Sequence, residues 1–523
     1  MNRRNVIQIA AASAAGLTLA GIPLSALAEG KRGGVLNAAI QPEPPGLNIG
    51  VYQNVPAVVV GGNIYEGLLK FDEKLNPLPC LATSWSVSAD GLVYTFKLKP
   101  NVKWHDGKPF SADDVVFSSD VFNRKMHARA RDNLAVVQSI RAVDPLTVEF
   151  KLKSTFGAFL GFFAGNALPM IPKHVFEGAA DFARHPGNET YVGTGPFRFK
   201  EWVKGSYIQL VRFDDYHEKG LPWLDAVYFH VIPDAAARAS AFESGKLDVL
   251  PGGSVENFDV ARLAKLPGVQ VTQKGWELFT PISHIVVNNR KAPMDNVKFR
   301  QALSLALDRE LMRKVAWYGY ADVSNGPFSS HLKFYDASIP KLTRNKEQSV
   351  KLLNEAGYKG ETLRLMPLPY GETWQRLAEI ARQNLADVGV KVQLVATDVA
   401  GWNAKMSDWD FDLAFTYVSG HGDPALGTTR HYTTSNIAKG TPFNNVEGFS
   451  NPKVDELFAR GAAEIDTAKR RVIYSELQKL LVDEMPVLWL HDLNFPTLYR
   501  TKVNNLINTG AGLVDSLTQT WMA

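Results

Sequence analysis

The strand and helix patterns of this chain are distributed unevenly over its 523 residues. Apolar and polar residues alternate, as in strands with one buried face, over 92–98, 146–152, 207–213, 227–232, 284–288, 391–396 and 411–417. Apolar residues at helical spacing predict long helices over 297–317, 372–388 and 468–483. Because neither a repeat nor a low-complexity linker separates these elements, the sequence predicts an α/β fold whose lobes are built from interleaved segments.

The first 28 residues have the pattern of an export signal. Arg3 and Arg4 precede an apolar stretch from Val6 to Leu27, and the small residues at 26 and 28 form a small-x-small cleavage site. We therefore expect export to the periplasm and cleavage after Ala28. The paired arginines also fit the twin-arginine route, so general secretion and twin-arginine export both stay open.

A transmembrane anchor is the alternative interpretation of this segment. Gly16, Gly21 and Pro23 make it a weak anchor. No later stretch of about 18 apolar residues is present. The nearest, over 156–172, is interrupted by Asn166 and Pro169 and is interpreted as buried core.

Charge and motif content argue against several functional classes. The 57 Lys and Arg residues nearly balance 53 Asp and Glu residues, which does not favour nucleic acid as a partner. The single cysteine, Cys80, allows neither an internal disulfide nor a thiolate metal cluster. No Gly-x-Ser-x-Gly elbow occurs, and Leu221 stands where a metalloprotease motif begun by His217 needs its second His. We therefore predict no catalytic residue, metal site or cofactor, and keep a secreted hydrolase as the alternative from another class.

Several motifs resemble one family. The segment 81–117, LATSWSVSADGLVYTFKLKPNVKWHDGKPFSADDVVF, closely resembles the signature of the family 5 extracellular solute-binding proteins, the peptide- and nickel-binding subunits of ABC importers. The resemblance continues, in the family's order, through TGPFRFKEW at 194–202, NVKFRQALSLALDRE at 296–310 and FSNPKVDELF at 449–458.

The resemblance implies a two-lobed periplasmic binding protein clamp of type II, in the large cluster with an extra subdomain. Lobe one is expected over 29–285 plus 490–523, with the extra subdomain over about 61–192, and lobe two over 286–489. Two crossing segments, near Ser283 to Asn288 and near Leu488 to Asp492, are expected to act as the hinge. Ligand is expected between the lobes, where closure buries it.

The function implied by the resemblance is that of a periplasmic substrate-binding protein. We expect a monomer that captures a small solute, a peptide or peptide-like compound, and delivers it to an inner-membrane ABC permease with ATPase subunits. A binder of an oligosaccharide, polyol or opine-like ligand in the same fold is the alternative. A metal chelate held through His421 or His431 has no support from spacing.

Each position of this chain that matches a ligand-binding position of the family is considered separately. Peptide-binding relatives pair the ligand's α-amine with an Asp at the position of Gly420. A carboxylate also stands at the position of Gln53 in oligopeptide binders, and a large aromatic covers the ligand at the position of Trp402. The candidate ligand-binding set is therefore Gln53, Val55, Trp402, Ser419, Gly420, His421 and Asp423, with Trp276 and His284 as weaker candidates near the first crossing.

Two of these residues have structural alternatives that stay open. Asp423 precedes Pro424 and also fits a turn residue, and Trp402 also fits core packing. Gly420 lacks the carboxylate that peptide-binding relatives have at this position, which favours a ligand other than an ordinary peptide with a free α-amine. Gln53, His421 and Trp402 suit a neutral, sugar-like ligand, because amides, imidazole and a flat aromatic face bind sugars well.

Overall fold

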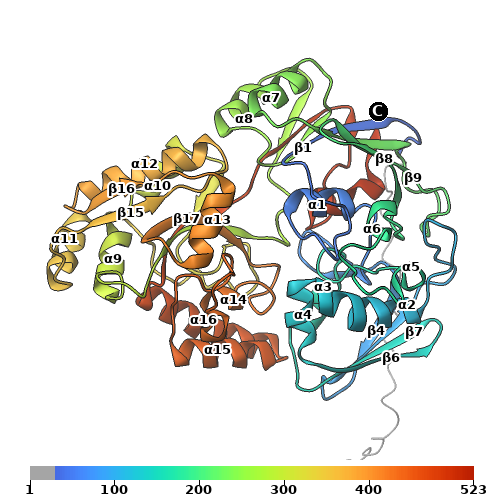
Figure 1. Cartoon of the computed structure of the whole chain (residues 1–523), viewed down its shortest axis with the longest axis horizontal. Helices are drawn as coiled ribbons and strands as arrows, with labels where there is room; N and C mark the ends of the chain where they lie inside the picture. The colour runs from blue at the N-terminus through green and yellow to red at the C-terminus, as the bar shows by residue number, and fades with distance from the viewer. Residues whose placement is uncertain (1–29) are drawn as a thin grey trace, which may run out of the picture.

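A computed structural model describes residues 30–523 of this protein, so the predicted export signal and its cleavage site lie outside the described residues. Two groups of elements lie side by side in Figure 1. One hydrophobic cluster contains residues from Leu36 to Leu278 and from Val503 to Leu517. The other runs from Ile282 to Leu493. We call the first group lobe one and the second lobe two. The predicted boundaries at 285/286 and 489/490 stay predictions.

Lobe one is built on a seven-stranded sheet with β1 near its centre. β1 pairs in parallel with β10 and β11, and the remaining pairs are antiparallel. In sheet order the strands are β12 (Val269–Thr272), β19 (Thr497–Arg500), β11 (Val249–Leu250), β1 (Val35–Ile40), β10 (Ala226–Val231), β9 (Tyr207–Arg212) and β8 (Phe197–Val203).

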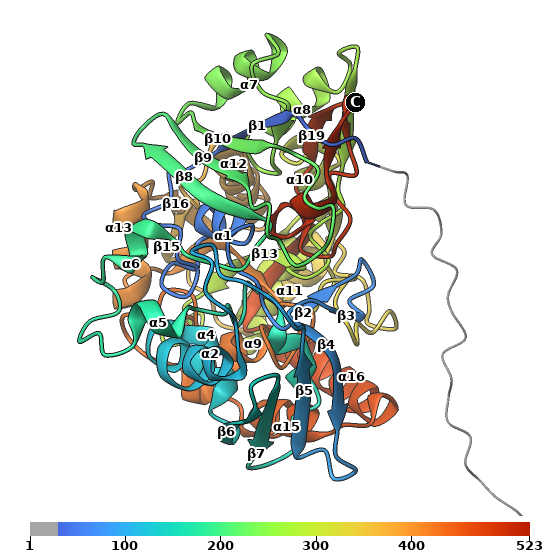
Figure 2. The ribbon, with the colours of Figure 1, turned by 90° about the vertical axis from the view of Figure 1, so that its right-hand side faces the viewer.

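A second, four-stranded antiparallel sheet belongs to the same lobe, at the end opposite the seven-stranded sheet (Figure 2). Its strands are, in order, β4 (Ala82–Val87), β5 (Val93–Leu98), β7 (Thr147–Leu152) and β6 (Val137–Asp144). Two short hairpin-like pairs, β2 (Leu69–Phe71) with β3 (Pro77–Pro79) and β20 (Val503–Asn504) with β21 (Trp521–Met522), complete the strands. The helices of this lobe are α1 (Val55–Gly61), α2 (Ala112–Val116), α3 (Arg124–Met126), α4 (Ala128–Leu134), α5 (Lys173–Phe176), α6 (Gly187–Thr190), α7 (Ala235–Glu243) and α8 (Asn257–Leu263).

Lobe two is built on a six-stranded mixed sheet. In order the strands are β14 (Ala321–Val323), β18 (Val487–Leu493), β13 (Pro281–Val287), β17 (Leu413–Ser419), β15 (Thr362–Met366) and β16 (Lys391–Leu394). Every residue of β13 and β18 is buried, because the sheet is covered on both faces, and their sequences are accordingly almost continuously apolar. The helices are α9 (Val297–Ala306), α10 (Arg309–Val315), α11 (Lys346–Glu355), α12 (Glu372–Ala386), α13 (Val399–Asp408), α14 (Thr429–Tyr432), α15 (Pro452–Ala463) and α16 (Thr467–Glu484).

The chain passes between the lobes at residues 273–280 and again at residues 494–496. The segments 283–288 and 488–492, expected as crossings, lie in or next to β13 and β18 of the six-stranded sheet, and their role as a hinge stays a prediction. The helix expected over 297–317 is two helices. Asp308 accepts a hydrogen bond from the backbone N of Leu311 at 2.9 Å and so caps the start of α10.

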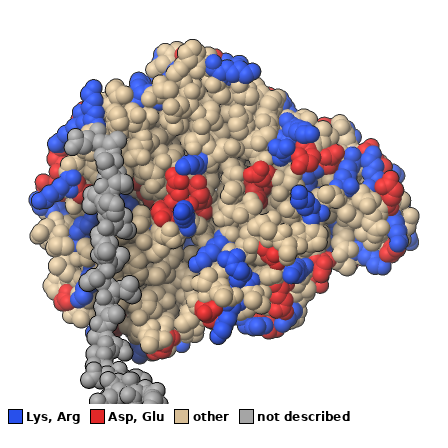
Figure 3. Space-filling model, turned by 180° about the vertical axis from the view of Figure 1, so that it is seen from behind, with Lys and Arg blue, Asp and Glu red and all other residues tan. Residues whose placement is uncertain are grey.

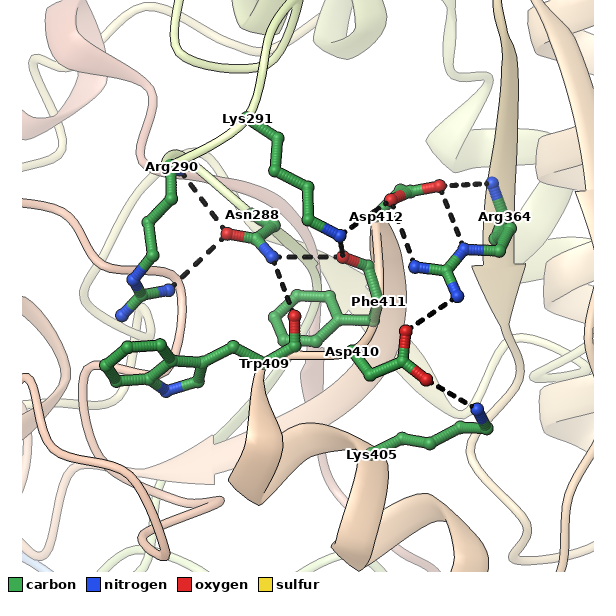
Figure 4. Close-up of polar contacts among 9 residues, drawn as sticks. All are labelled: Asn288, Arg290, Lys291, Arg364, Lys405, Trp409, Asp410, Phe411 and Asp412. Atoms are coloured by element: carbon green, nitrogen blue, oxygen red, sulfur yellow. Dashed lines mark hydrogen bonds and ion pairs between the residues drawn. The ribbon is translucent and has the colours of Figure 1, made fainter.

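A polar network fixes the start of β17, which leads to the predicted ligand-binding loop (Figure 4). Asn288 donates to the backbone oxygens of Trp409 and Phe411 at 3.1 and 3.0 Å. Arg364 on β15 donates to Asp412 at 3.2 Å and to Asp410 at 2.8 Å. The network therefore ties the end of α13 and the start of β17 to the neighbouring strand.

The charged residues on the face seen in Figure 3 are mixed, with Lys and Arg interspersed among Asp and Glu. This distribution agrees with the near balance of charge in the sequence. Among the helices that the structure describes, none combines the length and the apolar composition needed to cross a membrane.

Candidate functional site

The two crossing segments contact each other through aromatic side chains. The indole N–H of Trp276 donates to the backbone oxygen of Phe495 at 2.9 Å, and their rings are 5.1 Å apart. Phe279 packs on Trp276 with ring centroids 6.0 Å apart, and Phe495 packs on Tyr417 of β17 at 5.9 Å. Aromatic contacts therefore connect the crossings to the strand that carries the predicted ligand-binding loop.

Gly420 is closely packed against the side chains of Thr280 and Leu332. Its backbone N donates to the oxygen of Phe279 at 2.9 Å. A Cβ at this position would lie 2.7 Å from Thr280 Oγ1 and 2.9 Å from Leu332 Cδ1. Neighbouring Ser419 is the last residue of β17, where it pairs with Pro281. A larger residue here, such as the Asp of peptide binders, would therefore require the side chains of Thr280 and Leu332 to shift.

Asp423, a member of the predicted ligand-binding set, is paired with an arginine. Its two carboxylate oxygens accept from Arg470 at 2.9 and 2.7 Å, and both side chains are buried. Oδ1 also accepts from the backbone N of Ala425 at 3.0 Å. The guanidinium neutralises this carboxylate, which fits the structural alternative named above, and the role of Asp423 as a ligand contact stays a prediction.

Trp402 lies in the core of lobe two. Its side chain is 2 % exposed, and its ring stacks on Phe443 with centroids 6.1 Å apart and an interplanar angle of 27°. This position fits core packing, the alternative named above, and the prediction that Trp402 contacts the ligand stays a prediction.

Gln53 and Val55 lie at the start of α1 in lobe one. Gln53 donates to the backbone oxygen of Gly50 at 3.3 Å, and Val55 is 51 % exposed at the first position of the helix. Among the described residues, no hydrogen bond joins this segment to the loop over 419–423. Their place opposite the loop in a common ligand site stays a prediction.

His421 is the member of the predicted set that touches the other lobe. Nη1 of Arg129, on α4, lies 2.7 Å from Nδ1 and 3.0 Å from Nε2 of His421. Nη2 of Arg129 donates to the backbone oxygen of Asn166 at 3.1 Å. His421 has φ 51°, in the left-handed region that is uncommon for residues other than glycine and clusters at functional sites.

The surroundings of this contact are strongly positive. Burial and the charge of Arg430 lower the pKa of Arg129 to about 10. Burial, followed by the charges of Arg129 and Arg430, holds the pKa of His421 well below its ordinary value, and burial holds that of His431 low as well. Burial and Arg129 lower the pKa of His127 to about 3. These imidazoles are therefore neutral at neutral pH.

A pocket opens at this contact and is bounded by both lobes. Arg129, Asn133 and Asn166 line it from lobe one, and His421 and Leu426 from lobe two. Leu278, in the first crossing segment, closes it toward the aromatic side chains described above. The pocket thus joins the crossing, α4 and the loop after β17.

The sequence did not single out Arg129 or Arg430. The run His127-Ala-Arg129-Ala-Arg131 is a local signal of positive charge on a short helix. Nothing in that run indicates a partner 292 residues later in the chain.

The two weaker candidates have different surroundings. Trp276 is partly buried at the crossing. His284 is 4 % exposed on β13, and its Nδ1 has no hydrogen-bond partner. Within residues 30–523, no group of three or more His, Cys, Asp and Glu side chains is placed to hold a metal ion.

Comparisons of the sequence with a protein family and with known proteins identify the same family. The family described as bacterial extracellular solute-binding proteins, family 5, matches residues 76–440. The glutathione-binding protein GsiB of Pectobacterium atrosepticum is 29 % identical over 459 residues, covering 82 % of this chain and 83 % of that protein.

Two solved structures are similar over nearly the whole chain. The ABC transporter substrate-binding protein CtaP of Listeria monocytogenes has a TM-score of 0.83 and 25 % identity, covering 94 % of this chain and 100 % of that one. The oligopeptide-binding protein AppA of Bacillus subtilis, in complex with a nonapeptide, has a TM-score of 0.82 and 26 % identity, covering 95 % and 100 %.

Proposed function

The chain belongs to the family 5 bacterial extracellular solute-binding proteins, and from this premise we propose that it captures a peptide or peptide-like solute in the periplasm and passes it unchanged to an ABC permease. The names of the relatives support this ligand class: GsiB is a glutathione-binding protein, and AppA is an oligopeptide-binding protein. Membership of the family implies that the protein serves an ABC importer. The delivery to a permease, the periplasmic location and the ligand class are what we propose for this chain.

The observation that carries the proposal is the position of the pocket. Arg129 comes from lobe one and His421 from lobe two, and both line it beside a crossing segment. The pocket has a volume of about 10 Å³, room for one water molecule, so a solute enters only when the lobes part. Once bound there, it contacts both lobes. Its binding energy is therefore available to favour the closed arrangement of the clamp.

A thermal-shift screen of the mature protein tests the proposal. Peptides, glutathione, opines and sugars are added separately at millimolar concentration. A compound present at a hundredfold excess over its dissociation constant stabilises the folded state by about 2.7 kcal/mol. We expect at least one peptide or peptide-like compound to raise the melting temperature. A screen in which only sugars do so assigns the alternative ligand class, and one in which nothing binds contradicts the proposal.

Uptake of the solute by cells tests whether the protein delivers it to a permease. Deletion of the gene should abolish import of the compound found in the screen, and the intact gene on a plasmid should restore it. Unchanged import in the deletion strain would contradict the role in transport even if binding is confirmed.

A further inference from the structure

We propose that the end of α15 is a latch that holds the clamp closed in the absence of solute. The latch, residues 461–465, belongs to lobe two and docks on the loop that follows β7 in lobe one, residues 153–158. The inference rests on the two-lobed clamp of the proposed function. It goes beyond that function because it identifies a contact outside the pocket that opposes opening.

The first argument concerns the carbonyl groups at the end of α15. The last carbonyl oxygens of a helix have no partner within it and need one elsewhere. The oxygen of Ala462 accepts from the backbone N of Gly157 at 2.8 Å, and the oxygen of Ala463 accepts from the hydroxyl of Thr155 at 2.6 Å. Both donors belong to lobe one. Opening of the clamp therefore separates two helix-end carbonyls from the groups that cap them.

The carbonyl that precedes these two has its partner within lobe two. Nε of Arg470, on α16, donates to the oxygen of Gly461 at 2.9 Å, and both Nη atoms of the same side chain bind Asp423. Arg470 thus fixes the latch to the loop that follows β17. The latch is therefore positioned by lobe two itself, and lobe one supplies the caps of the last two carbonyls.

The second argument is the close approach of the two backbones. A Cβ at Gly157 would overlap with the backbone oxygen of Glu464 and lie 3.2 Å from Cδ of Arg470. The three atoms nearest to that position all belong to lobe two. The φ of Gly157 lies outside the left-handed region, so its backbone suits other residues too. The contact between the lobes, and not the packing of lobe one, therefore requires glycine here.

Apolar side chains extend the contact on both sides of the latch. Ala462 and Leu426 of lobe two pack against the hydrophobic cluster of lobe one. Ile465 lies beside Gly91, in the turn between β4 and β5, where a Cβ would be 3.5 Å from Cδ1 of Ile465. The docked arrangement therefore gains from the burial of apolar surface as well as from the two hydrogen bonds.

The latch lies away from the segments that cross between the lobes. Another helix end that lobe one caps is close to a crossing: Glu256 accepts from the backbone N of Glu372, at the start of α12, at 3.0 Å, and Gly252 packs against Phe495. Figure 1 shows α8, which follows Glu256, and α15 at opposite ends of the molecule. Because displacement in a hinge rotation grows with distance from the hinge, opening separates the latch more than the contact of Glu256.

The distance between two spin labels tests the latch in the ligand-free mature protein. Labels are attached through Val143→Cys on β6 of lobe one and Val472→Cys on α16 of lobe two, two positions that are 47 % and 69 % exposed. The native Cys80 is buried, and protein without the two substitutions should take up no label. We expect the labelled protein to show one predominant short distance, which represents the closed clamp.

Two substitutions in lobe one should open the clamp. Gly157→Ala places a methyl group against Glu464, and relief of this overlap should raise the ratio of open to closed molecules about tenfold or more. Thr155→Val keeps the shape of the side chain and removes the bond to Ala463. It should raise the same ratio about fivefold, the effect of one hydrogen bond. The double variant should show the longer distance most clearly.

Thr83→Val is the matched control for Thr155→Val. The hydroxyl of Thr83 donates to the backbone oxygen of Lys97 at 3.1 Å, within lobe one, so its removal should leave the distance distribution unchanged. Circular dichroism confirms that each variant is folded. An equal shift in Thr83→Val and Thr155→Val would assign the opening to a general loss of stability in lobe one and overturn the latch.

The remaining outcomes separate the latch from the function on which it rests. A long distance that already predominates without the substitutions overturns the latch, because the clamp is then open in the absence of solute. Unchanged distances in Gly157→Ala, Thr155→Val and the double variant overturn it as well. In both cases the solute-binding function is unaffected if a compound binds in the thermal-shift screen. If the variants open the clamp and no compound binds in that screen, the latch stands and the proposed function falls.

Discussion

Nη1 of Arg129 lies 2.7 Å from Nδ1 of His421, and the two residues belong to different lobes. A contact between a guanidinium and an imidazole persists only while the imidazole is neutral, because protonation places two positive charges in contact. The contact therefore links the protonation of one side chain to the arrangement of the lobes.

This link predicts that the ligand-free protein loses stability in mild acid. In the unfolded chain, His421 takes up a proton near pH 6.5, whereas burial and the charges of Arg129 and Arg430 keep it neutral in the folded state to a lower pH. The folded state then binds fewer protons, so the free energy of unfolding falls as the pH drops below about 6.5. Each such imidazole contributes about 1.4 kcal/mol per pH unit until it titrates in the folded state.

Urea unfolding at pH 7.0 and at pH 5.5 measures this effect. The charged and titratable groups around His421 are Arg129, Arg430, His127, His431 and, through Arg430, Asp132. The substitution His421→Asn keeps a hydrogen-bond acceptor but cannot titrate, so the loss of stability on acidification should become smaller. His331→Asn, at an exposed position, serves as the control. An unchanged pH dependence in His421→Asn would show that other groups are responsible.

Strands with alternating apolar and polar residues were predictable from sequence, whereas strands such as β1 and β18 and the contacts of the site were not. β5, β7 and β9 fall within a residue or two of the predicted ranges, because alternation along one strand is a local signal. The ion pair of Asp423 with Arg470 joins positions 47 residues apart, and the contact of Arg129 with His421 joins positions 292 apart. Such pairs depend on how the lobes pack, so a turn-forming Asp-Pro and a short basic helix gave no indication of them.

Export is the prediction that concerns the first residues of the chain. Mass spectrometry of periplasmic protein should show Glu29 as the first residue, because the small residues at 26 and 28 satisfy signal peptidase. The double substitution of Arg3 and Arg4 by Lys separates the two routes, and unchanged export would assign general secretion. An intact N-terminus in the membrane fraction would instead support an anchor.

The ion pair between Asp423 and Arg470 predicts a stability effect. Asp423→Asn leaves the buried guanidinium without its counter-charge, and breaking a buried pair in this way costs about 3–5 kcal/mol. Chemical unfolding should show this loss, whereas ligand affinity of the folded protein should change little. Asp483→Asn, on the exposed side of α16, should stay within about 0.5 kcal/mol of the wild type. If the Asp423→Asn protein is folded but no longer binds ligand, Asp423 belongs to the binding site.

Trp402 gives the corresponding prediction for lobe two. Its ring is 2 % exposed, so Trp402→Ala creates a cavity and should lower the free energy of unfolding by about 3–5 kcal/mol. Phe443→Ala, which removes the stacking partner from a side chain that is 45 % exposed, should have a smaller effect because less apolar surface is lost from the core. Calorimetric titration at low temperature, where the variant stays folded, should give the affinity of the wild type. A large loss of affinity in Trp402→Ala with unchanged stability would mean that this ring turns toward the ligand, and the assignment of Trp402 to the core would be wrong.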